Sequence, residues 1–204
     1  MKKLLFFFLA ICFSYGLASA QTFPSEVWHD GKVVLLEGDT LKGQVKYNLE
    51  TDLVQFSHDQ KTIKTYTARK LFFFEIFDNL SNRYRQFYVL PYGIKNNYKA
   101  PVIFEVLLQG KELSVLSRES VEYQVSNYPY SMAGSYTRMV LVHTHYFLKS
   151  DGTIHQFSGK KKDLIWIMNK KSGEIKKFIK ANKIRTDKRP DLMKTVAYYN
   201  SLFE

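Results

Sequence analysis

Between residues 32 and 157, short runs of β-branched and aromatic residues alternate with turn residues. This pattern is typical of antiparallel strands joined by hairpins. Gly38-Asp39 and His58-Asp59-Gln60 each separate two such runs, and Asp151-Gly152 precedes the last one. The expected strands cover residues 32–37, 41–47, 53–57, 62–67, 71–77, 84–90, 102–108, 112–116, 121–125, 139–148 and 153–157. About ten strands without an intervening helix predict a mainly β fold, an antiparallel barrel or sandwich.

After Gly159 the apolar residues recur at helical spacing. Ile175, Phe178 and Ile179 would share one face of an amphipathic helix. A second helix is predicted after Pro190, a residue that suits the first helical turn, and a short one over residues 164–168. We therefore expect a small α-helical segment at the C-terminal end, packed on the β domain.

The first twenty residues have the three parts of a cleavable signal peptide. Lys2 and Lys3 give a positive start, residues 4–13 are apolar, and Ala18-Ser19-Ala20 provides small residues for cleavage. An uncleaved anchor is the alternative, but the apolar stretch is shorter than the roughly 20 residues that a membrane span needs. The chain is therefore expected to be exported, to the periplasm, to the outer membrane as an associated protein, or to the medium. We expect no transmembrane span after cleavage.

Charge follows the same division of the chain, into a signal peptide (1–20), a β domain (21–158) and a helical segment (159–204). Of the net charge of +11, residues 21–158 contribute only +1, from 15 Lys and Arg against 14 Asp and Glu. Residues 159–204 hold 13 Lys and Arg against 5 Asp and Glu, a net of +8. A nearly neutral β domain thus precedes a strongly basic helical end.

The only cysteine, Cys12, lies inside the expected signal peptide. Ile11 is too bulky for the small residue that precedes a lipid-modified cysteine, so lipidation is the weaker interpretation. Neither disulfides nor thiolate chemistry is then expected in the mature chain. Its stability must come from a packed apolar core.

His143 and His145 are the most suggestive pair of candidate metal ligands, because residues two apart on a strand point to the same face. His155 is the nearest third ligand. A two-residue turn at Asp151-Gly152 would place His155 on the opposite face, whereas a three-residue turn over residues 150–152 would place all three histidines on one face. Both turns fit the sequence, so these histidines are weak candidates for a metal site.

The common catalytic signatures are absent from the sequence. There is no Gly-x-Ser-x-Gly elbow, no Gly-rich phosphate loop and no His-Glu-x-x-His helix. Glu75 and Glu105 would make a carboxylate pair only if they met across strands. We expect no cofactor and no enzymatic activity.

Several segments of the chain carry a resemblance to other sequences. They are Asp39-Thr40-Leu41-Lys42-Gly43, Phe87-Tyr88-Val89-Leu90-Pro91, Leu116-Ser117-Arg118-Glu119 and residues 191–202 with Tyr198-Tyr199-Asn200, together with residues 31–36, 63–66, 104–107 and 175–183. In these segments the chain resembles a group of uncharacterised exported proteins of Bacteroidota-type bacteria, to which no activity is assigned. The resemblance covers most of the mature chain, and it implies export and a β-rich fold but no site residues.

The lysines of the helical end, Lys176, Lys177, Lys180 and Lys183, would face away from the apolar side of their helix. They form a possible contact with an anionic envelope component, and nucleic acid is not expected as a partner of an exported chain. The tyrosine-containing loop 128–136 would either stack on a ligand or cover the end of the β domain. The function expected is therefore a non-catalytic exported protein that binds or scaffolds. The alternatives are a metal-dependent hydrolase using His143 and His145, and an integral outer-membrane β-barrel.

Overall fold

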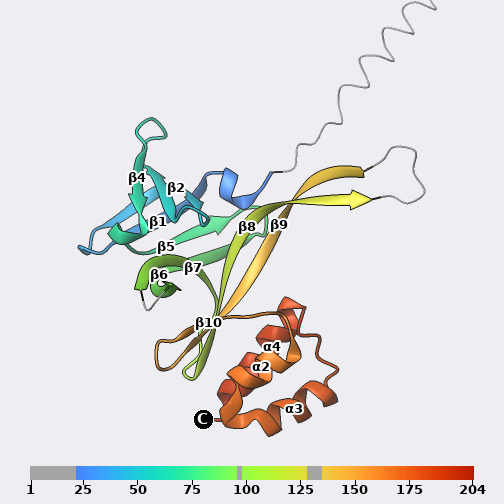
Figure 1. Cartoon of the computed structure of the whole chain (residues 1–204). Coiled ribbons are helices and arrows are strands. Elements are labelled where there is room, and N and C mark those ends of the chain that lie inside the picture. The colour runs from blue at the N-terminus through green and yellow to red at the C-terminus, as the bar shows by residue number, and fades with distance from the viewer. Residues whose placement is uncertain (1–21, 96–97, 128–134) are drawn as a thin grey trace, which may run out of the picture.

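The structure, a computed structural model, describes residues 22–95, 98–127 and 135–204 and is mainly antiparallel β with helices at the C-terminal end (Figure 1). The expected signal peptide and residues 128–134 of the tyrosine-containing loop lie outside this range. The strands are β1 (His29–Leu35), β2 (Thr40–Asn48), β3 (Leu53–Ser57), β4 (Lys64–Thr67), β5 (Leu71–Asp78), β6 (Arg83–Lys95), β7 (Tyr98–Leu108), β8 (Leu113–Asn127), β9 (Ser135–Lys149) and β10 (Ile154–Gln156).

All ten strands belong to one sheet in the order β10-β9-β8-β7-β6-β5-β1-β2-β3-β4. Each neighbouring pair is antiparallel, and β10 and β4 form the two ends of the sheet, so the sheet is not closed. The predicted fold class, mainly antiparallel β with a small helical C-terminal segment, is confirmed.

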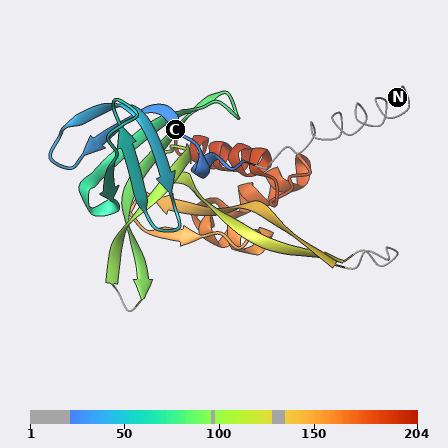
Figure 2. The same ribbon diagram turned by 90° about the horizontal axis from the view of Figure 1, so that it is seen from above.

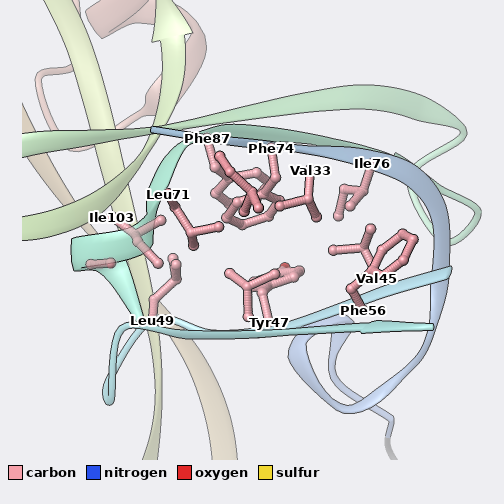
Figure 3. Packing of buried hydrophobic residues seen from close by; sticks show 13 residues of the cluster. Val33, Val45, Tyr47, Leu49, Phe56, Leu71, Phe74, Ile76, Phe87 and Ile103 are labelled. Atoms are coloured by element: carbon pink, nitrogen blue, oxygen red, sulfur yellow. The ribbon is translucent and has the colours of Figure 1, made fainter. Parts of the chain in front are cut away.

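The N-terminal half of the sheet folds over itself and encloses the first core (Figure 3). Apolar residues at alternate positions place their side chains on one face of each strand. Val33, Phe74 and Phe87 on β1, β5 and β6 thereby face Val45 and Tyr47 on β2 across this core. The turn between β1 and β2 passes through Gly38, whose φ of +99° suits glycine.

Three helices cover the other half of the sheet: α2 (Lys161–Ile167), α3 (Ser172–Ala181) and α4 (Arg189–Ser201). The second core lies between them and strands β8 and β9, and its buried members include Val115, Phe147, Ile175 and Val196. The side chain of Asn200 fastens α4 to β8, because it accepts hydrogen bonds from the backbone N–H groups of Glu112 (2.9 Å) and Leu113 (3.1 Å) and donates one to the Leu113 carbonyl (2.9 Å).

Strands β7 and β8 pair only over a short stretch. Glu105, Val106 and Leu108 of β7 pair with residues 115–117 of β8, while β8 pairs with β9 along its whole length. Beyond Ser117, residues 118–127 of β8 and 135–144 of β9 therefore form a two-stranded ribbon, the β-arm, that projects from the sheet (Figure 1). Figure 2 shows the β6–β7 hairpin and the β-arm pointing in different directions. The sheet is thus split between β7 and β8.

Among the residues that the structure describes, no helix combines the length and the apolar character needed to cross a membrane.

Candidate binding site at the split of the sheet

A row of polar residues crosses the sheet between the two cores. On β7, Ile103 belongs to the first core and Leu107 contacts the second, and Glu105 lies between them on the same face. The register places Glu105 opposite Phe87 of β6 and Ser117 of β8. The polar row therefore occupies the boundary between the folded-over half of the sheet and the helical half.

Arg85 of β6 is the centre of this row and is 3% exposed. Its guanidinium donates from Nε and Nη2 to the two oxygens of Glu105, at 3.0 and 2.8 Å, and from Nη2 to Glu119 Oε2 at 2.9 Å. Nη1 donates to the Tyr47 hydroxyl at 2.8 Å and to Asp78 Oδ2 at 3.4 Å. All five N–H groups of the guanidinium are used, which is the condition under which a buried charge is tolerated.

Tyr47 connects this cluster to the opposite layer of the fold. Its hydroxyl donates to Glu119 Oε1 and accepts from Arg85, and its ring packs on Phe87 at 4.9 Å. Burial raises the pKa of Tyr47, so the hydroxyl stays protonated at physiological pH. Burial alone would lower the pKa of Arg85, but the hydrogen bond to Glu105 and the surrounding negative charge raise it. The cluster therefore joins β2, β5, β6, β7 and β8 through hydrogen bonds and ion pairs.

The rim of the cluster is more open. Arg83 donates from Nη2 to Glu105 Oε1 at 3.1 Å, with its own side chain 42% exposed, and Arg189 at the start of α4 lies 4.0 Å from the same oxygen. His145 lies opposite Ser117, and His143 opposite Glu119. Desolvation lowers the pKa of His143, although its side chain is exposed at the surface of the sheet. The half-buried His145 has its pKa lowered by desolvation and, in addition, by the charge of the neighbouring His143.

Two polar atoms on this face have no hydrogen-bond partner among the described residues. They are Oγ of Ser117, a residue only 1% exposed, and Nε2 of His145. They belong to directly opposed residues of β8 and β9. A small polar group such as a water molecule is the ordinary partner for buried atoms of this kind.

The three candidate metal ligands are not brought together. His155 pairs with Phe147, so the three-residue turn over residues 150–152 is the one formed and His155 shares a face with His143 and His145. His155 nevertheless lies beside the second core, with its ring 5.1 Å from that of Trp166. It is two residue pairs along the ladder from His145, about 7 Å at the usual rise per residue. The described part of the chain holds no group of three or more His, Cys, Asp or Glu residues placed to bind one ion.

The carboxylate pair considered from the sequence is also not formed. Glu75 lies opposite Gln86, whereas Glu105 lies opposite Phe87, so the two glutamates point to opposite faces of the sheet. Glu75 instead accepts from Gln86 Nε2 at 2.7 Å and pairs with Lys32 at 3.1 Å.

A cleft of about 420 Å³ opens beside the buried cluster, between the short 3₁₀ helix η1 (Pro24–Glu26), β2 and β8. Glu119 belongs to both the cleft lining and the buried cluster. The other charged residues of the lining are Glu26, Glu50 and Lys46, and its larger apolar residues are Leu49, Val121, Tyr123 and Leu141.

Arg118 and Asp52 lie in the split between β7 and β8 and bind the backbone of β7 there. Asp52 Oδ1 accepts from the backbone N–H of Ile103 at 2.9 Å and from Arg118 Nη1 at 2.7 Å, and the same Nη1 donates to the Ile103 carbonyl at 2.7 Å. Arg118 Nη2 donates to the carbonyl of Leu49. These side chains satisfy the backbone groups of β7 that a continued pairing with β8 would have used.

The basic residues predicted on the helical end lie where the periodicity placed them. Lys176, Lys177 and Lys180 are exposed on α3, and Lys183 is exposed just after it. Ile175 and Ile179 on the other face of α3 are buried.

Arg85 and Glu119 were missed as site residues by the sequence analysis, and Glu105 was considered only as a partner of Glu75. The signal for Glu105 was a single charge at an inward position of an apolar strand, in Val102-Ile103-Phe104-Glu105-Val106. Such a residue is buried only if it is paired, so it points to a partner on another strand. A comparison of the chain with protein-family models, with curated proteins and with solved structures finds no match.

Proposed function

We propose that this protein is an exported, non-catalytic binding protein that takes its ligand in the cleft between η1, β2 and β8. The observation that carries this proposal is the split of the sheet, which leaves one edge of β8 open beside a cleft of about 420 Å³. Concave sites with a few polar groups on a rigid support are the usual ligand sites of proteins.

The buried cluster supports a binding role rather than catalysis. A catalytic acid or base must be able to change its protonation state near neutral pH. Arg85 uses its whole guanidinium on protein partners, and Glu119 is bonded through both oxygens. The cluster therefore serves to hold β8 rigidly against β2, so that the cleft keeps its shape.

Export rests on the N-terminal sequence, with Lys2, Lys3 and the Ala18-Ser19-Ala20 site. The basic face of the helical end, defined by Lys176, Lys177, Lys180 and Lys183, is a second binding surface in this proposal, for an anionic envelope component. Its support is that all four lysines are exposed on one helical region of net positive charge.

The test of the cleft is an NMR titration of the isotope-labelled mature chain with three pools: synthetic peptides, envelope glycans and anionic phospholipid vesicles. We expect at least one pool to shift the amide signals of Glu50, Val121 and Tyr123. Tyr123→Ala should weaken that binding, whereas Tyr84→Ala should not. The two tyrosines form a matched pair, because they are 75% and 69% exposed and only Tyr123 lines the cleft. If no pool shifts these amides, the proposal is wrong.

The basic face has a separate test. Lys176→Gln with Lys177→Gln should weaken retention of the protein on anionic vesicles, and added salt should weaken retention of the unmodified protein. If neither the substitutions nor added salt changes retention on the vesicles, the basic face is not a binding surface and its lysines serve only solubility.

A further inference from the structure

We propose that the ligand of the cleft is an extended polypeptide segment with basic side chains, which pairs as an additional strand with the outer edge of β8. This inference rests on the proposed function, since it names the ligand class of the same site. Strand addition is a general way in which an open sheet edge binds a peptide, with backbone hydrogen bonds providing affinity.

The outer edge of β8 can be identified from one hydrogen bond. The backbone N–H of Val121 points away from β9 and donates to Glu50 Oε1 at 3.1 Å. Backbone groups of alternate residues point to the same side of a strand. The N–H and C=O groups of Tyr123 and Val125 therefore point outward as well, and no described strand pairs with them.

Glu50 marks one end of this edge. Its carboxylate occupies the Val121 N–H, so a strand can be added only from Tyr123 toward Asn127. The available edge is about 13 Å long at the usual rise per residue. An added strand of about five residues fits it, and one end of that strand would reach the cleft.

One face of the β-arm carries apolar side chains. The register places Val121 opposite Leu141 and Tyr123 opposite Met139, and Val125 lies on the same face. Tyr123, Val125 and Met139 are 75%, 64% and 41% exposed. Apolar side chains of an added strand would pack against this row, as cross-strand neighbours do within a sheet.

The charged residues of the cleft lining indicate which kind of peptide would bind. In the described part of the chain, the carboxylates of Glu26 and Glu50 accept hydrogen bonds from the backbone N–H groups of Phe23 and Val121, and the carboxylate of Glu119 pairs with Arg85. Among the described residues that line the cleft, Lys46 is the one cation. A basic peptide is thus favoured. A second copy is not, because the matching edge of its β8, residues 123–127, contains no Lys or Arg.

The test compares Val125→Pro with Val125→Ala. Both variants lose the valine side chain, and only the proline variant loses the outward N–H. Proline is tolerated at this kind of position, because the N–H that it removes faces the open edge of a strand. The probes are two synthetic nonapeptides, one of alternating lysine and valine and one of alternating glutamate and valine.

We expect the lysine peptide to slow hydrogen exchange at the Tyr123 and Val125 amides of the unmodified protein. We also expect the protein to bind the lysine peptide more tightly than the glutamate peptide. Val125→Pro should bind the lysine peptide about fivefold more weakly than Val125→Ala. Equal binding by the two variants, or unchanged exchange at both amides, would overturn strand addition. The exchange measurement needs no variant, so it decides the matter even if Val125→Pro fails to fold.

The remaining outcomes separate this inference from the proposed function. If glycans or vesicles shift the amides of Glu50 and Val121 and neither peptide does, the cleft is a binding site and its ligand is not a peptide. If nothing shifts these amides, both proposals are wrong. If the unmodified protein is a dimer that Val125→Pro converts to a monomer, a second copy occupies the edge and the peptide proposal is overturned.

Discussion

Arg118 of β8 and Asp52 of the β2–β3 turn form an ion pair of 2.7 Å at the point where β8 leaves β7. The side chains are 18% and 24% exposed, so the pair is largely shielded from water. Asp52 also binds the Ile103 N–H, and its φ of +52° places it in the left-handed region. The turn between β2 and β3 thereby connects β7 and β8 where the two strands separate.

Asp52→Ala should lower the free energy of unfolding by about 2 kcal/mol, because it leaves Arg118 and the Ile103 N–H without their acceptor. The measurement is chemical denaturation. Arg185→Gln is the control, since it breaks an exposed pair with Asp187 whose side chains are 65% and 59% exposed. That change should cost less than about 1 kcal/mol. Equal effects of the two variants would contradict a stabilising role of the Asp52–Arg118 pair.

Arg85→Met should be among the most destabilising changes in the β half, at about 3–5 kcal/mol, because it leaves Glu119 buried without its cation and removes two hydrogen bonds from the buried Glu105. Arg83→Met is the matched control, since Arg83 binds the same Glu105 from a side chain that is 42% exposed. Its cost should be below about 1 kcal/mol. Similar midpoints of thermal unfolding for both variants would show that the cluster carries little of the stability.

Acidification should destabilise the fold through His143 and His145. Desolvation lowers the pKa of both groups below the usual 6.5, although the side chain of His143 is exposed and that of His145 is half-buried. The unfolded chain then binds more protons than the folded one as pH falls below about 6.5, so stability decreases in that window and is fully present above it. His143→Gln with His145→Gln should flatten the slope of unfolding free energy between about pH 6.5 and 5, and an unchanged slope in the double variant would contradict this prediction. Asp78 affects stability only at lower pH. Burial would raise the pKa of its carboxyl, but hydrogen bonds from Ser81 and Leu80 and the charge of Arg85 lower it below 3.8.

Phe178→Ala should lower the unfolding midpoint, because the ring of Phe178 stacks on that of Tyr198 at 4.1 Å between α3 and α4. The ring is half-buried, so the expected cost is about 1–2 kcal/mol. Lys176→Gln with Lys177→Gln changes only exposed side chains of the same helix and should move the midpoint by less than about 0.5 kcal/mol. A larger effect of the lysine pair would mean that charge, not packing, holds α3 in place.

The mature chain should begin at Gln21 and be recovered from the periplasm or the medium. N-terminal sequencing of the native protein checks this. Recovery of Met1 on membrane-bound protein would contradict the signal peptide.

The sequence by itself predicted most of the strands and the helices after them, although the two strands expected over residues 112–116 and 121–125 form the single strand β8. Alternation of apolar and polar residues is local, so the hairpins around Gly38 and Asp151-Gly152 and the helices after Gly159 could be predicted from neighbouring residues. The same holds for the buried and exposed faces of α3, where Ile175 and Ile179 pack inward and Lys176, Lys177 and Lys180 face the solvent.

Only the tertiary structure decided which charges meet and where the sheet opens. Arg85 lies 20 residues from Glu105, 34 from Glu119 and 38 from Tyr47, and Arg118 lies 66 residues from Asp52. No local pattern specifies such partners, because strand order and register depend on how the whole sheet folds over its first core. A one-residue change of turn length moves a residue to the other face. The sequence therefore did not determine on which face of the sheet His155 lies. The three-residue turn before β10 places it on the same face as His143 and His145.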